Sequence, residues 1–139
     1  MKWYLAGRTR HIKNLRLVGD ALRNKEEEVV SNWFYGEKFD DYESQLPLIQ
    51  DLAVTIIHEV QESDIFVLIS DEKGTDMFLE LGVALGKSIS KEIKIYIVGK
   101  HSKRSIMSLH PKCEHVADLG VVFKKEGIDM RDFIVPDLR

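Results

Sequence analysis

Apolar residues along this chain follow two alternating periods, and the alternation predicts strands that are each followed by a helix. Short, mostly apolar runs at residues 3–6, 29–34, 65–69 and 93–99 are typical of strands, and a fifth strand is expected among residues 115–123. The run at 65–69 is apolar at every position, as in a strand that is covered on both faces.

Helices are predicted between these runs, because apolar residues recur there every three or four positions. Pro47 suits the first turn of the second helix, and Thr75 can cap a third helix that runs to about Lys87. Residues 35–44 are predicted to be loop, and a last short helix is expected over residues 130–134. The apolar stripe of the first helix comprises Ile12, Leu15, Val18, Ala21 and Leu22, and that of the second comprises Ile49, Leu52, Ala53, Ile56, Ile57 and Val60.

Strands that alternate with helices indicate a parallel sheet built from right-handed crossovers. The predicted fold is therefore α/β, a single flavodoxin-like or Rossmann-like domain over residues 1–139, with about five strands and helices on both faces. Ligands of such sheets bind beyond the carboxyl ends of the strands. The loops expected to carry chemistry are thus residues 7–10, 33–40, 70–76 and 99–105.

Composition and charge exclude several classes of protein. With 44% hydrophobic residues the chain is too apolar for disorder, and a formal net charge of -3 argues against a nucleic-acid partner. The longest apolar run and the amino-terminal residues fit neither a membrane span nor a signal peptide, so we expect a cytoplasmic protein without a membrane partner. One cysteine, Cys113, and five histidines without ligand spacing predict no metal site.

Glu80 is the main candidate for catalysis. It lies one turn inside a helix that is otherwise apolar, where a carboxylate is costly unless it is paired or used. Asp76 lies four residues earlier on the same face, and two carboxylates there would repel and raise one pKa. The alternative is that Glu80 faces solvent or pairs with Lys87 or Arg10.

The turn before this helix and the loop after the first strand are candidate substrate sites. Free backbone N–H groups at a glycine turn favour an anion or a sugar hydroxyl, which makes Asp71, Gly74 and Thr75 candidates. Residues 7–10 offer a glycine, a hydroxyl and two guanidinium groups, which suit a phosphate. These candidates are Gly7, Arg8, Thr9 and Arg10. The alternatives are solvated arginines and a helix cap at Thr9.

Two aromatic residues and two glycines complete the candidates. Tyr4 and Trp33 lie near strand ends, where they are either core residues or groups that stack on a base or bond near an anomeric carbon. Gly82 and Gly86 are predicted to let their helix lie close to the sheet.

In these residues the chain resembles the nucleoside 2-deoxyribosyltransferase family, which includes N-hydrolases of nucleoside 5′-monophosphates. Three pieces match in order: residues 4–7 (Tyr-Leu-Ala-Gly), residues 63–67 (Ser-Asp-Ile-Phe-Val), and residues 74–75 followed by 80–84 (Glu-Leu-Gly-Val-Ala). The resemblance implies that Glu80 is a nucleophile that forms a glycosyl-enzyme ester, and that Tyr4 positions or tunes it. It also implies that Arg10 contacts phosphate, and that the protein is a homo-oligomer, a dimer or larger, without a cofactor.

Two features depart from the family pattern. The spacing from Gly74 and Thr75 to Glu80 is longer than in many relatives. Eight residues before Asp64 the family carries an aspartate, and here that residue is Ile56. Asp51 and Thr55 are nearby, but neither is in register.

The leading hypothesis is an enzyme that cleaves or transfers the N-glycosidic bond of a 2′-deoxynucleoside or its 5′-monophosphate, with a small-molecule nucleoside or nucleotide as its partner. One alternative is a NAD glycohydrolase of the Toll/interleukin-receptor type, which also uses a helix glutamate. The other is a non-catalytic nucleotide sensor, which is favoured by Ile56 in place of the family's aspartate.

Overall fold

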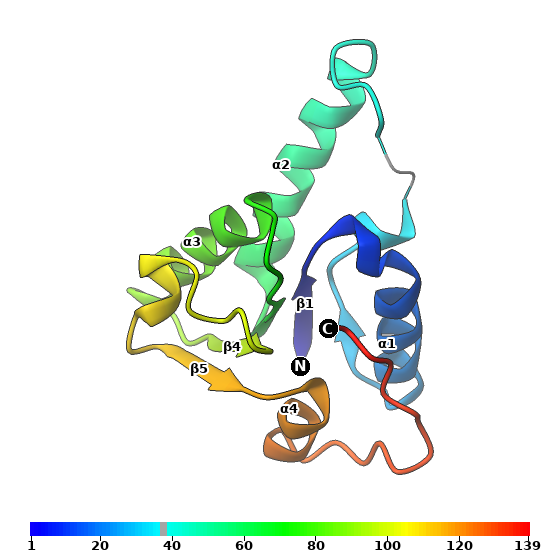
Figure 1. Cartoon of the computed structure of the whole chain (residues 1–139), viewed down its shortest axis with the longest axis vertical. Coiled ribbons are helices and arrows are strands. Elements are labelled where there is room, and N and C mark those ends of the chain that lie inside the picture. The colour runs from blue at the N-terminus through cyan, green and yellow to red at the C-terminus, as the bar shows by residue number, and fades with distance from the viewer. Residues whose placement is uncertain (37–38) are drawn as a thin grey trace.

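The computed structural model describes residues 1–36 and 39–139 and places five parallel strands in one sheet, in the order β2-β1-β3-β4-β5 (Figure 1). The strands are β1 (Lys2–Ala6), β2 (Glu28–Val29), β3 (Ile65–Ile69), β4 (Lys94–Val98) and β5 (Cys113–Val116). The central strand β3 pairs Ile65 with Trp3 on one side and with Lys94 on the other. The predicted parallel α/β sheet is confirmed, while residues 37 and 38 of the predicted loop 33–40 lie outside the described residues.

In the described part of the chain, four α-helices cover the two faces of the sheet. Helices α1 (Ile12–Asn24) and α4 (Leu119–Lys125) share one apolar cluster, and α2 (Leu46–Glu62) and α3 (Asp76–Ser88) share the other. Because successive side chains of a strand point to opposite faces, Trp3 and Leu5 pack with α1 and α4, whereas Tyr4 and Ala6 pack with α2 and α3. This two-sided burial explains why β3 is apolar at every position.

The strand predicted over residues 29–34 is wrong beyond its first residue. After β2 the chain leaves the sheet and forms a 3-10 turn, η2 (Trp33–Tyr35). Side chains then bond to the edge of β1: the Leu5 N–H donates to Ser31 Oγ at 3.0 Å, and Trp33 Nε1 donates to the Leu5 carbonyl at 2.7 Å. A side chain that satisfies the strand edge removes the need for further strand pairing.

The carboxyl-terminal elements also differ from the prediction. The fifth strand begins earlier than expected, at Cys113, and α4 begins within the predicted strand because Asp118 accepts the Val121 N–H at 3.1 Å and caps it. No helix forms over residues 130–134. Instead Asp129 accepts the Arg131 N–H at 3.1 Å, a local bond that favours a turn.

Two predicted helices form, but the residues that they bury differ from the prediction. Helix α2 forms as predicted, but only Glu59 and Val60 are buried in it, and its first half extends beyond the sheet (Figure 1). Gly82 and Gly86 do not face the sheet: both are exposed, and a Cβ added at either would meet nothing within 4 Å. The apolar face of α3 toward the sheet contains Met77, Leu81, Ala84 and Leu85 instead.

None of the helices in the described part of the chain is both long and apolar enough to span a bilayer.

Candidate active site

A pocket of about 250 Å³ opens at the carboxyl end of β1. Strand β2 lies on one side of β1 and β3 lies on the other, so the loops that follow β1 and β3 turn away from each other. Loops that diverge in this way leave a crevice between them. Loop residues after β1 and β2 meet α2 and α3 there. The pocket is lined by Gly7, Thr9, Ile12, Trp33, Phe39, Tyr42, Leu52, Ile56, Asp76 and Glu80.

Glu80 is the buried acid of this pocket, with 9% of its surface exposed. The Tyr4 hydroxyl donates a hydrogen bond to Glu80 Oε1, and the Tyr4 ring stacks on Phe66 with 5.6 Å between centroids. Burial raises the pKa of Glu80 to about 7, the bond from Tyr4 opposes the rise, and the nearby charges of Asp76 and Glu59 add to it. The pKa of this carboxyl therefore lies near neutral pH, where a carboxyl can serve as an acid, a base or a nucleophile.

The two structural alternatives for Glu80 are both wrong. Its side chain is buried, so it does not face solvent. Lys87 donates to the Ser63 carbonyl and Arg10 pairs with Asp71, so neither cation is bonded to Glu80.

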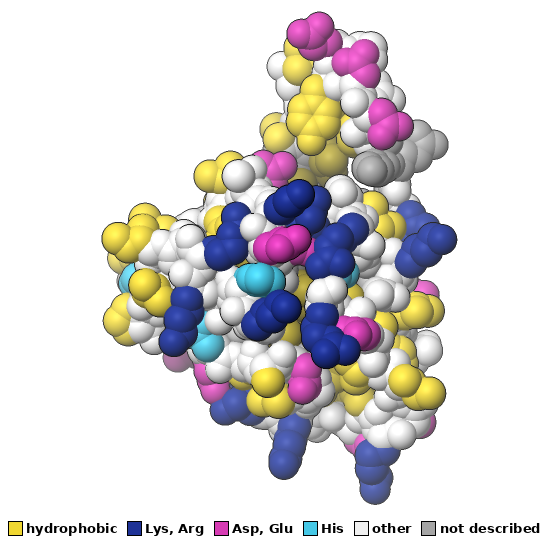
Figure 2. All heavy atoms as spheres, viewed as in Figure 1, with side chains coloured by type: hydrophobic (Ala, Val, Ile, Leu, Met, Phe, Trp, Pro, Cys, Tyr) yellow, Lys and Arg dark blue, Asp and Glu magenta, His cyan; other side chains and the backbone are white. Residues whose placement is uncertain are grey.

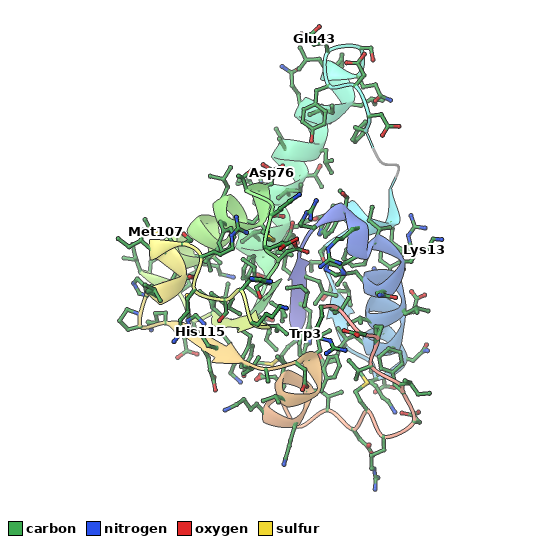
Figure 3. The ribbon with its side chains drawn as sticks, viewed as in Figure 1. Trp3, Lys13, Glu43, Asp76, Met107 and His115 are labelled. Carbon is green, nitrogen blue, oxygen red and sulfur yellow. The ribbon has the colours of Figure 1, made fainter. Side chains whose placement is uncertain are left out.

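Asp76 lies at the first residue of α3 and also lines the pocket (Figure 3). It is exposed, whereas Glu80 four residues later is buried. The prediction that Asp76 and Glu80 lie on one face of the helix is confirmed, because both line the pocket. Asp76 is in contact with solvent, whereas Glu80 is largely shielded from it. Trp33, half-buried, lines the pocket and is oriented by its bond to the Leu5 carbonyl.

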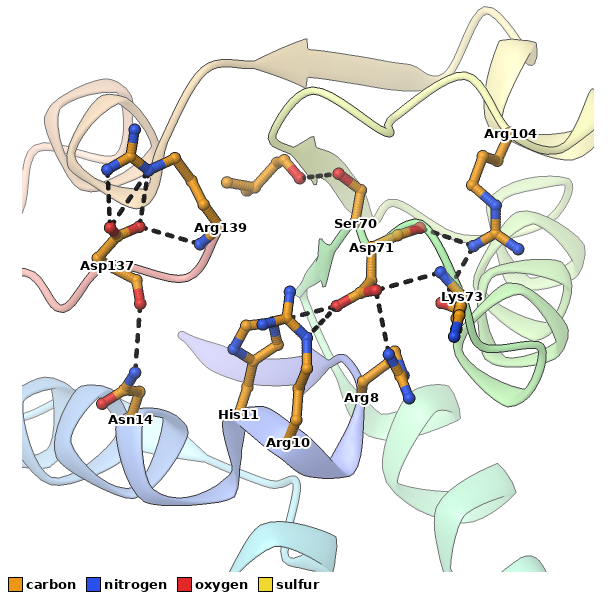
Figure 4. A network of polar contacts seen from close by, with 11 residues as sticks. Arg8, Arg10, His11, Asn14, Ser70, Asp71, Lys73, Arg104, Asp137 and Arg139 are labelled. Carbon is orange, nitrogen blue, oxygen red and sulfur yellow. Dashed lines mark hydrogen bonds and ion pairs between the residues drawn. The ribbon is translucent and has the colours of Figure 1, made fainter.

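A network of arginines surrounds Asp71 beside the pocket (Figure 4). The Asp71 carboxylate is 1% exposed; Arg10 Nε lies 2.5 Å from Oδ2, and Arg8 Nη1 lies 3.3 Å from Oδ1. His11 Nε2 is 3.5 Å from the same carboxylate. Burial acts to raise the pKa of Asp71, but hydrogen bonds from Arg10, the Lys73 N–H and Arg8 hold it well below its usual range.

Arg104 holds the loop that leads into α3. Its guanidinium donates to the carbonyls of Asp71 at 2.7 Å, Lys73 at 3.1 Å and Gly74 at 3.3 Å. It also lies over the Phe78 ring, 5.2 Å from the centroid. Two guanidinium groups on the Asp71 carboxylate and a third on the backbone of the same loop leave excess positive charge on this face, where Figure 2 shows Lys and Arg side chains gathered. This edge of the pocket favours an anion.

The structure thus sorts the predicted site residues into three groups. Those that line the pocket are Gly7, Thr9, Trp33, Asp76 and Glu80. Tyr4 lies behind them, bonded to Glu80. The residues of the positive edge and the loop before α3 are Arg8, Arg10, Asp71, Gly74 and Thr75. Thr75 occupies the N-cap position, but its side chain makes no capping hydrogen bond.

Sequence reasoning missed Glu59, a second buried acid close to Glu80. It lies one turn after Ile56, which lines the pocket, whereas Asp51 and Thr55 are both exposed. A search for any acid within one helical turn of position 56 would have found it. Sequence reasoning also missed Phe39, Tyr42 and Leu52 of the pocket wall, because nothing in their local pattern distinguishes them.

A larger cavity of about 500 Å³ lies at the carboxyl ends of β3, β4 and β5. Ser70 and Gly99 line it, and the chain segment from Val135 to Arg139 forms one wall. Glu80 does not line it, so we place the candidate chemistry in the smaller pocket. Within residues 1–36 and 39–139, no three His, Cys, Asp or Glu side chains gather as a metal site would require.

No protein-family model and no curated protein sequence matches this chain. Two solved structures are similar to it. The CMP N-glycosidase BcmB of Clostridium botulinum has a TM-score of 0.58 and 12% identity over 91% of this chain and 98% of its own. A 2-deoxyribosyltransferase of Bacillus psychrosaccharolyticus has a TM-score of 0.57 and 16% identity over 97% of each chain. The chain therefore has the fold of the nucleoside 2-deoxyribosyltransferase-like enzymes.

Proposed function

We propose that this protein breaks the N-glycosidic bond of a nucleoside or nucleotide with Glu80 as its nucleophile. The observation that carries the proposal is the buried Glu80, bonded to Tyr4 at the wall of a pocket at the carboxyl edge of the sheet. Two proteins with this fold act on such substrates, one as a CMP N-glycosidase and one as a 2-deoxyribosyltransferase.

The reaction follows retaining glycoside chemistry. A Glu80 oxygen bonds to C1′ of the sugar while the bond from C1′ to the base breaks. The electron pair of that bond leaves with the base nitrogen, which takes a proton from water. Water then attacks C1′ of the ester, releases a proton and restores the carboxylate; attack by a second base instead gives transfer.

The positive edge of the pocket favours a substrate with a 5′-phosphate. Arg8 and Arg10 flank Thr9, which lines the pocket, and both retain exposed surface beside their bonds to Asp71. We expect Arg10→Ala to weaken turnover of a deoxynucleoside 5′-monophosphate much more than that of the free nucleoside, measured as kcat/KM. Lys13→Ala, an exposed cation on α1, is the control. Equal losses on both substrates would contradict a phosphate contact.

The assay for the main proposal incubates the protein with deoxynucleosides, ribonucleosides, their 5′-monophosphates and NAD, and follows released base or nicotinamide by chromatography. We expect base release from a nucleoside or nucleotide, and a loss of roughly a thousandfold or more in Glu80→Gln. Glu72→Gln, an exposed acid of the preceding loop, should retain the rate. Nicotinamide release alone would assign the NAD glycohydrolase activity instead, and binding without turnover would assign a sensor.

A second copy of the chain is the proposed partner. The outer face of α3 is defined as Leu79, Gly82, Val83 and Gly86 together with Ile89, which directly follows the helix. This face carries no charge; Leu79 is 70% exposed and Ile89 is 87% exposed. An exposed helix face in a monomer is ordinarily polar. Two copies of a chain with formal net charge -3 repel one another, but an interface without charged side chains avoids repulsion at the contact itself. The exposed glycines of this face also let a second helix approach closely.

The oligomeric state tests this partner. We expect a dimer in analytical ultracentrifugation, and a monomer after Ile89→Glu. Leu17→Glu replaces an equally apolar exposed residue on α1, on the other face of the sheet, and should leave the dimer intact. A monomeric wild-type protein, or the same effect from both substitutions, would rule out this surface.

A further inference from the structure

Glu59 is held in a fixed position behind the pocket. It is 7% exposed and lies on α2 one turn after Ile56, which lines the pocket together with Glu80. Asn32 bonds both of its oxygens: Nδ2 lies 3.0 Å from Oε1, and the backbone N–H donates to Oε2 at 3.3 Å. Asn32 directly precedes Trp33, so the residue that fixes Glu59 is adjacent to the pocket wall.

The buried acids of this region lack a balancing cation. Within the described part of the chain, no Lys, Arg or His lies at ion-pair distance from Glu59 or Glu80. The groups that act on Glu80 are Tyr4 from β1, Glu59 from α2 and Asp76 from α3 itself. The charge of Glu59 adds to the effect of burial in raising the pKa of both Glu80 and Tyr4.

Uncompensated negative charge destabilises a folded protein unless something positive approaches it. In glycosidic cleavage the sugar becomes positively charged as the bond to the base breaks. Fixed negative charge near C1′ then stabilises the transition state more than the neutral sugar of the substrate.

We propose that Glu59, held by Asn32, is a positioning residue that acts through Glu80 and supplies negative charge for the positively charged sugar of the transition state. This inference rests on the proposed function. Glu59 is then the second acid of the site. It lies one turn after Ile56, the residue that stands where the family carries an aspartate. Glu59 does not line the pocket, so its effect is electrostatic and needs no contact with substrate.

The test follows the ionisation of Glu80 by NMR of carboxyl-labelled protein, together with the pH dependence of kcat/KM. Glu59→Gln removes the charge and keeps a group that Asn32 can bond; Glu59→Asp retains the charge. Glu62→Gln, an exposed acid one turn further along α2, is the matched control.

We expect Glu59→Gln to move the titration of Glu80 down by roughly one pH unit, because a like charge has been removed. The plateau rate should fall roughly tenfold, although more of the enzyme is ionised. Glu59→Asp should preserve both values. A merely structural defect would lower the rate without moving the titration.

If Glu59→Gln does not fold, Asn32→Ala serves as the second variant, since Asn32 is exposed and the substitution removes the Nδ2 bond that favours the ionised form of Glu59 while the backbone N–H bond remains. It should move the titration of Glu80 in the same direction. An unmoved titration in these variants, or an equal shift in Glu62→Gln, would overturn the inference. The NMR titration needs no turnover, so a wild-type protein without glycosidic activity would refute the proposed function separately.

Discussion

At the scale of single residues, Glu80 is exceptional because its environment opposes ionisation. The carboxyl is surrounded by the apolar cluster between the sheet and helices α2 and α3, and the Tyr4 hydroxyl is its hydrogen-bond donor. Burial therefore favours the protonated form, while Tyr4 favours the carboxylate. The balance between these two effects sets the pH range in which a nucleophile exists.

This balance predicts the acid limb of the pH profile. If Glu80 reacts as a carboxylate, kcat/KM should rise with pH through about 7 and then level off. Tyr4→Phe removes the bond that favours ionisation, so the midpoint should move to higher pH, and the rate lost at pH 7 should be partly regained at higher pH. A midpoint that stays in place or moves to lower pH would contradict the role of Tyr4.

The same residue predicts a conflict between stability and activity. The pKa of Glu80 is about 7 in the folded protein, whereas in the unfolded chain the carboxyl has the ordinary pKa of a glutamate, 4.5. Stability from this group is therefore complete below pH 4.5 and is lost as pH rises through about 7. Glu80→Gln should be inactive yet more stable than wild type at pH 8, by roughly 3 kcal/mol.

Urea unfolding at pH 4 and pH 8 checks this expectation. The stability difference between Glu80→Gln and wild type should be small at pH 4 and large at pH 8. A difference that is independent of pH would show that Glu80 does not titrate between the two values.

At the scale of elements, the loop between β3 and α3 sets the direction of the helix that carries Glu80. Gly74 has φ +98°, and a Cβ added there would lie 3.0 Å from Arg8 Cγ. Arg104 bonds the carbonyls on the other side of this loop. The loop is therefore tightly held between residues that follow β1 and β4.

Gly74→Ala should strain this loop and disturb Asp71 and its arginines. We expect it to lower the free energy of unfolding by about 2 kcal/mol. Gly127→Ala is the control, because Gly127 also has positive φ (+72°) but has nothing within 4 Å of an added Cβ. Its cost should be about 1 kcal/mol, from backbone strain alone. Equal costs at the two positions would show that the contact with Arg8 contributes nothing.

At the scale of the whole molecule, the carboxyl-terminal segment closes the α1 and α4 side of the structure without forming a regular element. Phe133, Val135 and Leu138 pack against the apolar cluster of that face, and Val135 to Arg139 form a wall of the larger cavity. Asn14 Nδ2 bonds the Asp137 carbonyl at 3.3 Å. Side-chain burial, rather than backbone pairing within a helix or strand, holds this segment.

Adjacent residues of the segment allow a matched comparison. Phe133 is partly buried against the core, whereas Ile134 is 92% exposed. Phe133→Ala should lower the free energy of unfolding by about 2 kcal/mol, and Ile134→Ala should change it by less than about 0.5 kcal/mol. Thermal or urea unfolding measures both, and similar losses would mean that the segment is not packed as described.

The sequence by itself was enough for the order and type of most elements, because hydrophobic periodicity is a local property. The buried strand over residues 65–69 and the helix that carries Glu80 both follow from it. The prediction of Glu80 as a buried acid is likewise confirmed, because its neighbours along the helix are apolar. The expectation of a longer second strand failed, since side chains of Ser31 and Trp33 bond the edge of β1 instead.

Only the tertiary structure decided which distant groups meet. Tyr4 and Glu80 are 76 residues apart, Arg10 and Asp71 are 61 apart, and Asn32 and Glu59 are 27 apart. Their contacts depend on strand order and on how helices pack across the sheet, which no local pattern encodes. The outward direction of Gly82 and Gly86 was decided in the same way, because the same spacing on a helix fits either face.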